Sequence, residues 1–173
     1  YVEGDPANPL SAYGRSKWEA EKALREEGPE HLLIRSQWLY GPHGRNFVLT
    51  ILEKAKRGES LRVVSDQTGC PTYARDLADA TCRLIEAGAR GTYHFSNDGE
   101  TTWYDFASFL LAHACTGPIS LAPAFTSDLP YPAPRPAYSV LDKRKYREAT
   151  GDTPRRWEEA ALDFLKQTCE TRH

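Results

Sequence analysis

The 173-residue sequence lacks the features that mark several classes of protein. No apolar run reaches the ~18 residues that a membrane span needs, and no charged-then-apolar leader opens the chain. The formal net charge of −2 provides no general attraction to nucleic acid or to an anionic membrane. The four cysteines are scattered without a close pair, and the five histidines form no zinc-type spacing with them. We therefore expect a reduced, cytoplasmic protein with no structural metal, no nucleic-acid partner and no membrane segment.

A glycine-rich dinucleotide fingerprint is also missing, because neither G-x-G-x-x-G nor G-x-x-G-x-x-G occurs in the chain. Gly41 and Gly44 have the right separation, but Phe47 takes the third position. Such a fingerprint lets the backbone approach a pyrophosphate at a helix N-terminus. By itself, the sequence is not expected to bind a nicotinamide cofactor in the usual way.

Tyr13 and Lys17 form the first candidate catalytic site. Pro9 and Ser11 are helix start signals, and residues 17–27 have a helical pattern. Side chains four residues apart share one helix face, with Cβ atoms roughly 5–6 Å apart. A nearby ammonium group favours the phenolate, which would make the phenol a useful general acid. Either the pair is a coincidence of composition, or the chain, which opens on tyrosine and lacks the fingerprint, is the C-terminal part of a larger protein.

Short apolar segments alternate with helical patterns along the rest of the chain, which predicts an α/β fold. The mostly apolar segment 31–35 is typical of a strand covered on both faces, as in parallel sheets. The predicted strands are residues 31–35, 61–64 and 92–95, and the predicted helices are 47–57, 73–87, 101–115, 142–150 and 153–167.

Two segments between these elements are candidate site walls. Residues 36–46 follow the first strand, and ligands of open α/β sheets lie beyond the carboxyl ends of strands. Within this loop Trp38 is either a ligand contact or a packing residue, and Asn46 suits both a helix N-cap and a phosphate contact. Residues 119–136 lie in a stretch too rich in proline for a helix or a central strand. It is either an exposed linker or a stiff frame for Arg135, whose guanidinium can pair bidentately with phosphate.

Four ordered motifs resemble one family. Residues 8–17, 35–41 with 46–47, 66–72 and 135–142 are similar, in that order, to segments of dTDP-4-dehydrorhamnose reductases, which are extended short-chain dehydrogenases. The resemblance runs from about residue 1 to residue 157. It implies a partial Rossmann-like domain, without its N-terminal cofactor half, joined to a small α/β substrate-binding domain. Residues 1–40 and about 73–92 would belong to the former, and residues 41–72 and 93–173 to the nucleotide-sugar domain.

The resemblance also implies site roles. Tyr13 would protonate the C4 oxygen of dTDP-4-dehydro-L-rhamnose while hydride arrives from NADPH, with NADH as the alternative cofactor. Lys17 would assist Tyr13 and hold the nicotinamide ribose. The matched motifs imply six further contacts: Ser36 and Gln37 near the cofactor, Trp38 on the hexose, and Asn46, Gln67 and Arg135 near the nucleotide diphosphate. Some members use Mg²⁺ at a dimer contact; a homodimer is compatible with the sequence, but no Mg²⁺ site can be placed in it.

The chain departs from the family in ways that keep two alternatives open. The glycine motif and the catalytic Ser or Thr lie upstream of the tyrosine in the family and are absent here, so the isolated chain is expected to be inactive. Cys70 stands where the family usually has a smaller residue. One alternative is another nucleotide-sugar enzyme, such as a 4-epimerase. The other is a non-enzymatic NADP-binding regulatory subunit resembling methionine adenosyltransferase β.

Overall fold

The computed structural model describes residues 1–114, 119–129 and 133–170, without the side chains of the last two. Helices and short strands alternate through these ranges, which confirms the predicted α/β class. The elements in order are α1 (Ala12–Glu26), β1 (Leu32–Arg35), β2 (Leu39–Tyr40), α2 (Phe47–Lys56), β3 (Leu61–Val64), β4 (Thr68–Gly69), β5 (Thr72–Tyr73), α3 (Ala74–Glu86), β6 (Gly91–His94), β7 (Thr101–Thr102), α4 (Trp103–His113), β8 (Leu121–Ala124), η1 (Thr126–Asp128), α5 (Arg144–Thr150) and α6 (Trp157–Glu170).

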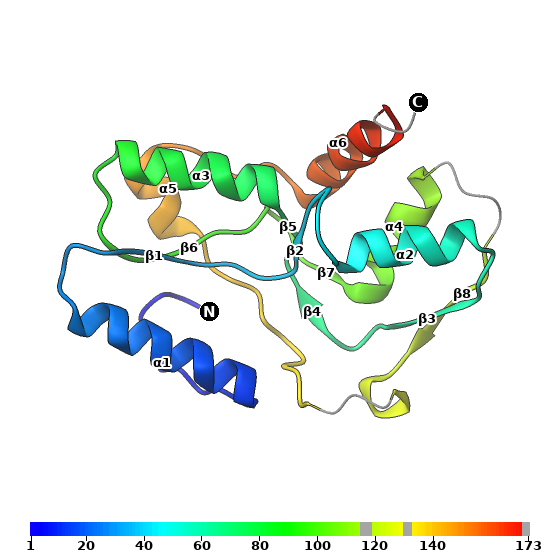
Figure 1. The fold of residues 1–173 in the computed structure, drawn as a ribbon, viewed down its shortest axis with the longest axis horizontal. Helices are drawn as coiled ribbons and strands as arrows, with labels where there is room; N and C mark the ends of the chain where they lie inside the picture. The colour runs from blue at the N-terminus through cyan, green and yellow to red at the C-terminus, as the bar shows by residue number, and fades with distance from the viewer. Residues whose placement is uncertain (115–118, 130–132, 171–173) are drawn as a thin grey trace.

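The strands pair in twos. β1 pairs with β6, β2 with β5 and β3 with β8, all in parallel, and β4 pairs with β7 in the antiparallel sense. Parallel neighbours need a crossover, and helices lie between the partners of the longer pairs. Figure 1 shows β1 and β6 running between α3 on one face and α1 on the other. The division into two domains and the partial Rossmann arrangement stay predictions.

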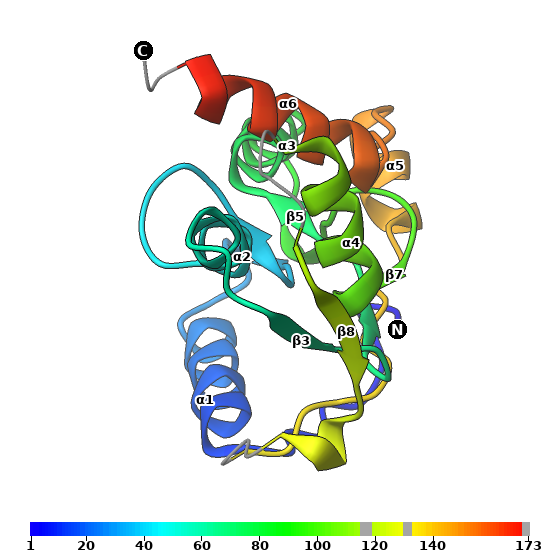
Figure 2. The same cartoon turned by 90° about the vertical axis from the view of Figure 1, so that its right-hand side faces the viewer.

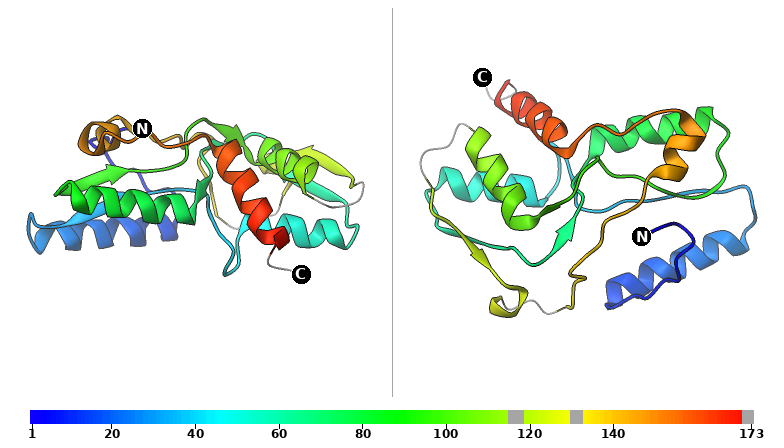
Figure 3. Two further views of the ribbon diagram at one scale, coloured as in Figure 1. Left: turned by 90° about the horizontal axis from the view of Figure 1, so that it is seen from above. Right: turned by 180° about the vertical axis from the view of Figure 1, so that it is seen from behind.

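Three apolar clusters build the core. One unites α3, α5 and β6, where Leu84, Tyr93 and Tyr146 are buried together. A second lies under α2, α4 and α6 and includes Tyr40 and Phe164. A third joins α2, β3 and α4 through Ile51, Leu61, Val63 and Ala107. Figure 2 shows α4 and β8 with α2 and β3 beside them. Figure 3 shows α6 between the part that contains α3 and α5 and the part that contains α2 and α4. The second cluster therefore continues from α2 and α4 into the β2–β5 pair.

An exposed linker was one of two expectations for the proline-rich segment 119–136. The segment contains the strand β8. Among the described residues β8 pairs only with β3, in the register Leu61↔Leu121, and its other edge has no strand partner there. Pro123 is exposed in this strand, as an edge position allows, because proline removes no ladder hydrogen bond on an unpaired side. Several residues used in the sequence patterns lie outside the described ranges: Cys115, Pro118, Pro130, Pro132 and His173.

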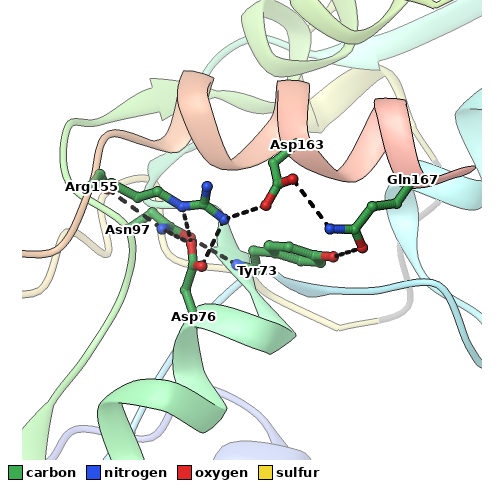
Figure 4. A network of polar contacts seen from close by, with 6 residues as sticks. All are labelled: Tyr73, Asp76, Asn97, Arg155, Asp163 and Gln167. Carbon is green, nitrogen blue, oxygen red and sulfur yellow. Dashed lines mark hydrogen bonds and ion pairs between the residues drawn. The ribbon is translucent and has the colours of Figure 1, made fainter. Parts of the chain in front are cut away.

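A polar network fastens α3 to the start of α6 (Figure 4). Arg155 binds Asp76 through two hydrogen bonds, Nε–Oδ2 of 2.9 Å and Nη2–Oδ1 of 2.7 Å, and reaches Asp163 at 2.9 Å. Asn97 accepts a hydrogen bond from the backbone N–H of Tyr73 and donates one to Asp76. Burial opposes ionisation of Asp163, but the hydrogen bond and charge of Arg155 outweigh it and lower the pKa of this carboxyl group. The network ties elements that are far apart in sequence.

Candidate functional site

Tyr13 and Lys17 lie on the exposed face of α1. Ser11 starts this helix, because its Oγ accepts a hydrogen bond of 3.1 Å from the backbone N–H of Gly14. The Lys17 Nζ lies 5.5 Å from the centroid of the Tyr13 ring, and the Tyr13 side chain is 71% exposed. The phenol is therefore open to a ligand and has a cation near its ring.

The loop after β1 begins with Ser36, which is exposed, and Gln37, which is half-buried. The Gln37 Nε2 donates to the carbonyl oxygen of Ser139 at 2.7 Å, and the Ser139 Oγ donates back to Gln37 Oε1 at 2.7 Å. Ser139 also donates its backbone N–H to the Thr68 carbonyl at 2.9 Å. Ser139 thus joins three segments of the chain by bonding both Gln37 and Thr68, while the Ser36 side chain is accessible to a ligand.

Trp38 has an unusual backbone and an aromatic partner. Its φ of 49° makes it the one non-glycine residue in the described ranges with a left-handed φ, a conformation that bulky side chains rarely adopt. Its ring stacks on Trp103 with centroids 3.6 Å apart and planes 13° apart. On Gly69 a Cβ would lie 2.7 Å from Trp38 Cε2, so only glycine leaves room for the ring. Packing therefore fixes the Trp38 ring against Trp103 and Gly69.

Asn46 is the N-cap of α2, as the sequence predicted. Its Oδ1 accepts from the backbone N–H of Leu49 at 3.0 Å, and its Nδ2 donates to the carbonyl oxygen of Gly41 at 2.9 Å. Both polar ends of the amide are engaged within the chain. The side chain lines a different cavity from the one that holds Gln67 and Arg135.

Gln67 and Arg135, although 68 positions apart by number, line one cavity of about 510 Å³ between α2 and β3. Gln67 is 3% exposed, and its Nε2 donates to the Oγ1 of Thr126 at 3.0 Å. Trp103 forms part of the wall, and Phe47 packs on it with ring centroids 4.4 Å apart. The lining residues are Arg45, Phe47, Thr50, Ile51, Lys54, Ser60, Leu61, Arg62, Val63, Val64, Gln67, Trp103 and Arg135.

The charge of this cavity has one sign. Arg45, Lys54, Arg62 and Arg135 are cationic, and the described lining contains no carboxylate. Arg62 is partly offset by Asp128, 3.4 Å away. Cations, an amide and an apolar wall together suit a ligand that has an anionic part and a flat or apolar part.

The structure brings some predicted site residues together and leaves others apart. Gln67 and Arg135 share the cavity, and Trp38 adjoins it through Trp103. Tyr13 and Lys17 are not part of its lining; the first turn of α1 lies on the side of the molecule where the segment after residue 133 passes (Figure 1).

Sequence reasoning gave no site role to Trp103, Lys54 or Arg62, which line the cavity, and placed Arg45 only within the candidate loop 36–46. Arg45 precedes a helix cap and Trp103 follows one, which were the available local signals. The described part of the chain contains no group of three or more His, Cys, Asp or Glu side chains placed to hold a metal ion. Its helices include none with the length and apolarity needed to cross a membrane.

A family model and individual relatives both match this chain. The model of the RmlD substrate binding domain matches residues 1–169. The spore coat polysaccharide biosynthesis protein SpsK of Bacillus subtilis is 41% identical over 96% of this chain and 58% of its own length. A dTDP-4-dehydrorhamnose reductase of Burkholderia thailandensis is 38% identical over 87% of this chain and 56% of its own length.

A solved structure agrees with this. The dTDP-4-dehydrorhamnose reductase of Bacillus anthracis, in complex with NADP, superimposes with a TM-score of 0.93 at 34% identity, over 97% of this chain and 59% of that one. The chain thus spans less than two thirds of the length of the relatives it matches. The chain belongs to the RmlD substrate-binding domain family. The proteins similar to it include dTDP-4-dehydrorhamnose reductases.

Proposed function

We propose that the full-length protein containing this chain reduces dTDP-4-dehydro-L-rhamnose to dTDP-L-rhamnose with NADPH. The observation that carries this proposal is the cationic cavity that holds Gln67 and Arg135, in a chain that also exposes a Tyr13–Lys17 pair. A nucleoside diphosphate sugar combines two phosphates with a base and a sugar, and the cavity combines cations with an amide and an apolar wall.

Each side chain has a defined part in this proposal. Arg135 pairs with the diphosphate, because a guanidinium fork matches phosphate oxygens. The carbonyl oxygen of Gln67, which has no partner among the described residues, accepts a hydrogen bond from the ligand. The Tyr13 hydroxyl gives its proton to the C4 oxygen of the sugar as the C4 carbonyl is reduced to an alcohol. The Lys17 ammonium stabilises the phenolate that remains.

The chain fits only one end of a nicotinamide cofactor. Tyr13, Lys17 and Ser36 are exposed and can contact the nicotinamide and its ribose, whereas the Gln37 amide is engaged with Ser139. Nothing in the sequence matches the glycine-rich turn that cradles a pyrophosphate. When bound, the cofactor supplies the hydride for C4. We therefore expect the 173-residue chain alone to bind dTDP but not to oxidise NADPH.

The identity of the product tests the proposal. The full-length protein is incubated with NADPH and dTDP-4-dehydro-L-rhamnose, and the sugar nucleotide is identified by NMR. The proposal predicts stoichiometric NADPH oxidation and dTDP-L-rhamnose. Interconversion of C4 epimers without net NADPH consumption would instead support a 4-epimerase, and NADP binding without turnover would support a regulatory subunit.

A further inference from the structure

A chain of hydrogen bonds holds the side-chain amide of Gln67 at the cavity. The Thr126 Oγ1 lies 2.8 Å from Asp66 Oδ1 and 3.0 Å from Gln67 Nε2. The Thr126 backbone N–H also donates to both carboxylate oxygens of Asp66, at 3.0 Å each. Asp66 and Gln67 follow β3, and Thr126 begins η1. Each of these contacts lies between two described residues, so it does not depend on how much of the surface other parts of a longer protein would cover.

The single proton of the Thr126 hydroxyl decides which way this amide points. An ionised carboxylate only accepts hydrogen bonds, so the hydroxyl donates to Asp66. The backbone and hydroxyl hydrogen bonds from Thr126 lower the pKa of Asp66, which keeps this carboxylate ionised near neutral pH. The Thr126 oxygen then has only lone pairs left for Gln67, which must present its NH₂ group to it. The Gln67 carbonyl oxygen, Oε1, therefore points away from Thr126.

The free edge of the amide requires a hydrogen-bond donor on the ligand. Gln67 is buried in the wall that it shares with Arg135, and its Oε1 has no partner among the described residues. A buried carbonyl oxygen that a bound ligand leaves unpaired weakens binding. The diphosphate of a nucleotide sugar carries no proton at neutral pH and cannot donate to it. This orientation differs from the diphosphate contact that the family resemblance implies for Gln67.

The other walls of the cavity suit a flat ring. Phe47, Trp103 and Val64 line it together with Gln67, and aromatic and apolar side chains pack well on the face of a base. A pyrimidine-2,4-dione such as thymine has an imide N–H between two carbonyl oxygens. That edge complements Oε1 and the second N–H of the Gln67 amide. Cytosine has an unprotonated ring nitrogen in the same place, which would meet Oε1 as a second acceptor.

We propose that Gln67 selects a pyrimidine-2,4-dione base through its carbonyl oxygen, and that Asp66 and Thr126 are positioning residues that hold the amide in this orientation. This inference rests on the proposed reductase function, which brings a thymine nucleotide to the cavity. With cytosine the carbonyl oxygen stays buried and unpaired. The protein should therefore bind dCDP about 5- to 150-fold more weakly than dTDP.

Calorimetric titrations of the full-length protein with dTDP and dCDP test the inference. Thr126→Val removes the hydroxyl, so the Gln67 amide can turn over and offer Nε2 to the cytosine ring nitrogen. The preference for dTDP should then fall to within about threefold of equality. Thr126→Ser keeps a hydroxyl and should retain the preference. Equal affinities of the wild type for dTDP and dCDP, or a full preference in Thr126→Val, would overturn the inference.

Asp66→Asn makes the same change without altering Thr126. The new amide can donate to the Thr126 oxygen, which leaves the hydroxyl proton for Gln67 Oε1 and turns the amide over. This variant should also lose the preference, and a preference equal to that of the wild type would contradict the positioning role. Thr81→Val is the matched control, because the Thr81 hydroxyl bonds the Leu77 carbonyl within α3. A loss of preference in this control would show that general destabilisation causes the effect.

A third nucleotide distinguishes the base from the sugar as the source of the donor. 3′-Deoxythymidine 5′-diphosphate lacks the 3′-hydroxyl of dTDP but keeps the imide N–H. Its affinity for the wild-type protein should lie within about threefold of that of dTDP. A loss as large as that of dCDP would assign Gln67 Oε1 to the sugar hydroxyl and overturn the inference. A protein that prefers dTDP but does not reduce dTDP-4-dehydro-L-rhamnose would instead refute the proposed function.

Discussion

Gly69→Ala tests whether Trp38 is held by steric fit. The new Cβ would lie 2.7 Å from Trp38 Cε2, 2.8 Å from Trp38 Cζ2 and 2.8 Å from the Oε1 of Gln37. Real Cβ atoms essentially never approach so closely, so the indole or the backbone must move. The φ of Gly69 does not lie in the left-handed region, so the substitution adds a clash without backbone strain.

The expected loss of stability follows from the packing. Overfilling a well-packed site costs about 1–3 kcal/mol. Displacing the Trp38 ring from Trp103 removes a further ~0.5–1.5 kcal/mol of aromatic stacking. Each kcal/mol shifts the Tm of a chain of this size by about 2–4 °C, so Gly69→Ala should lower it by about 3–18 °C. The near-ultraviolet circular dichroism of the stacked indoles should decrease as well.

Two further variants make this experiment decisive. Gly4→Ala is the control, because nothing lies within 4 Å of its new Cβ, and it should change stability by less than about 0.5 kcal/mol. In a Trp38→Leu background Gly69→Ala should cost less, since only the Gln37 contact remains. Equal Tm values for Gly69→Ala and the wild type would refute the steric account of Trp38.

Three other variants probe the cavity and the network that supports it. Arg135→Ala should weaken dTDP binding by about 10- to 150-fold in calorimetric titrations, because a charged hydrogen bond to phosphate is lost, whereas Arg90→Ala, on the surface beside Glu30, should not. Asn46→Ala should cost about 0.5–2 kcal/mol of stability in thermal denaturation through loss of the N-cap, and leave dTDP affinity unchanged; a weaker affinity would show that Asn46 contacts the ligand. Folding lowers the pKa of Asp163, so its ionised form stabilises the protein above the unfolded pKa of ~3.9, and this stabilisation is lost as the pH falls through the folded value. Asp163→Asn should therefore reduce the loss of stability between about pH 5 and pH 2 in acid titrations, and an unchanged acid profile would contradict the role of Arg155.

Local signals predicted most of the elements. Ser11, Asn46 and Thr102 cap α1, α2 and α4, and each cap was visible as a polar residue before an apolar pattern. The strands at 32–35, 61–64 and 91–94 lie within one residue of the segments predicted as strands, 31–35, 61–64 and 92–95. These features depend on neighbours in sequence, which is why the sequence alone predicts them.

Long-range geometry could not be predicted in the same way. The two-residue strands β4 and β5 fell in a segment expected to be a loop, because their pairing depends on partners 30 or more positions away. The stacking of Trp38 on Trp103 joins residues from separate elements, and no periodicity indicates it. The hydrogen bonds between Gln37 and Ser139 join residues 102 positions apart. The motif around Gln37 therefore gave no sign that its amide is bonded within the chain.

The candidate site likewise has local features that the sequence predicts and long-range features that it does not. The Tyr13–Lys17 spacing is local, and the helix brings the two side chains together as expected. The meeting of Gln67 and Arg135 in one cavity rested on the family resemblance, since neither residue is near the other in sequence. The cationic side chains Lys54 and Arg62 had no predicted role, because only the tertiary structure shows that both line this cavity.

The most direct test of the proposed reaction is a comparison of wild-type and Tyr13→Phe full-length protein with NADPH and dTDP-4-dehydro-L-rhamnose. Single-turnover NADPH oxidation measures the chemical step, and calorimetric titration with dTDP-L-rhamnose measures binding. If the Tyr13 hydroxyl supplies the proton, the phenylalanine variant should lose at least about 100-fold in the chemical rate and keep its affinity within about twofold. A variant that turns over at the wild-type rate, or that loses affinity as much as rate, would contradict the account.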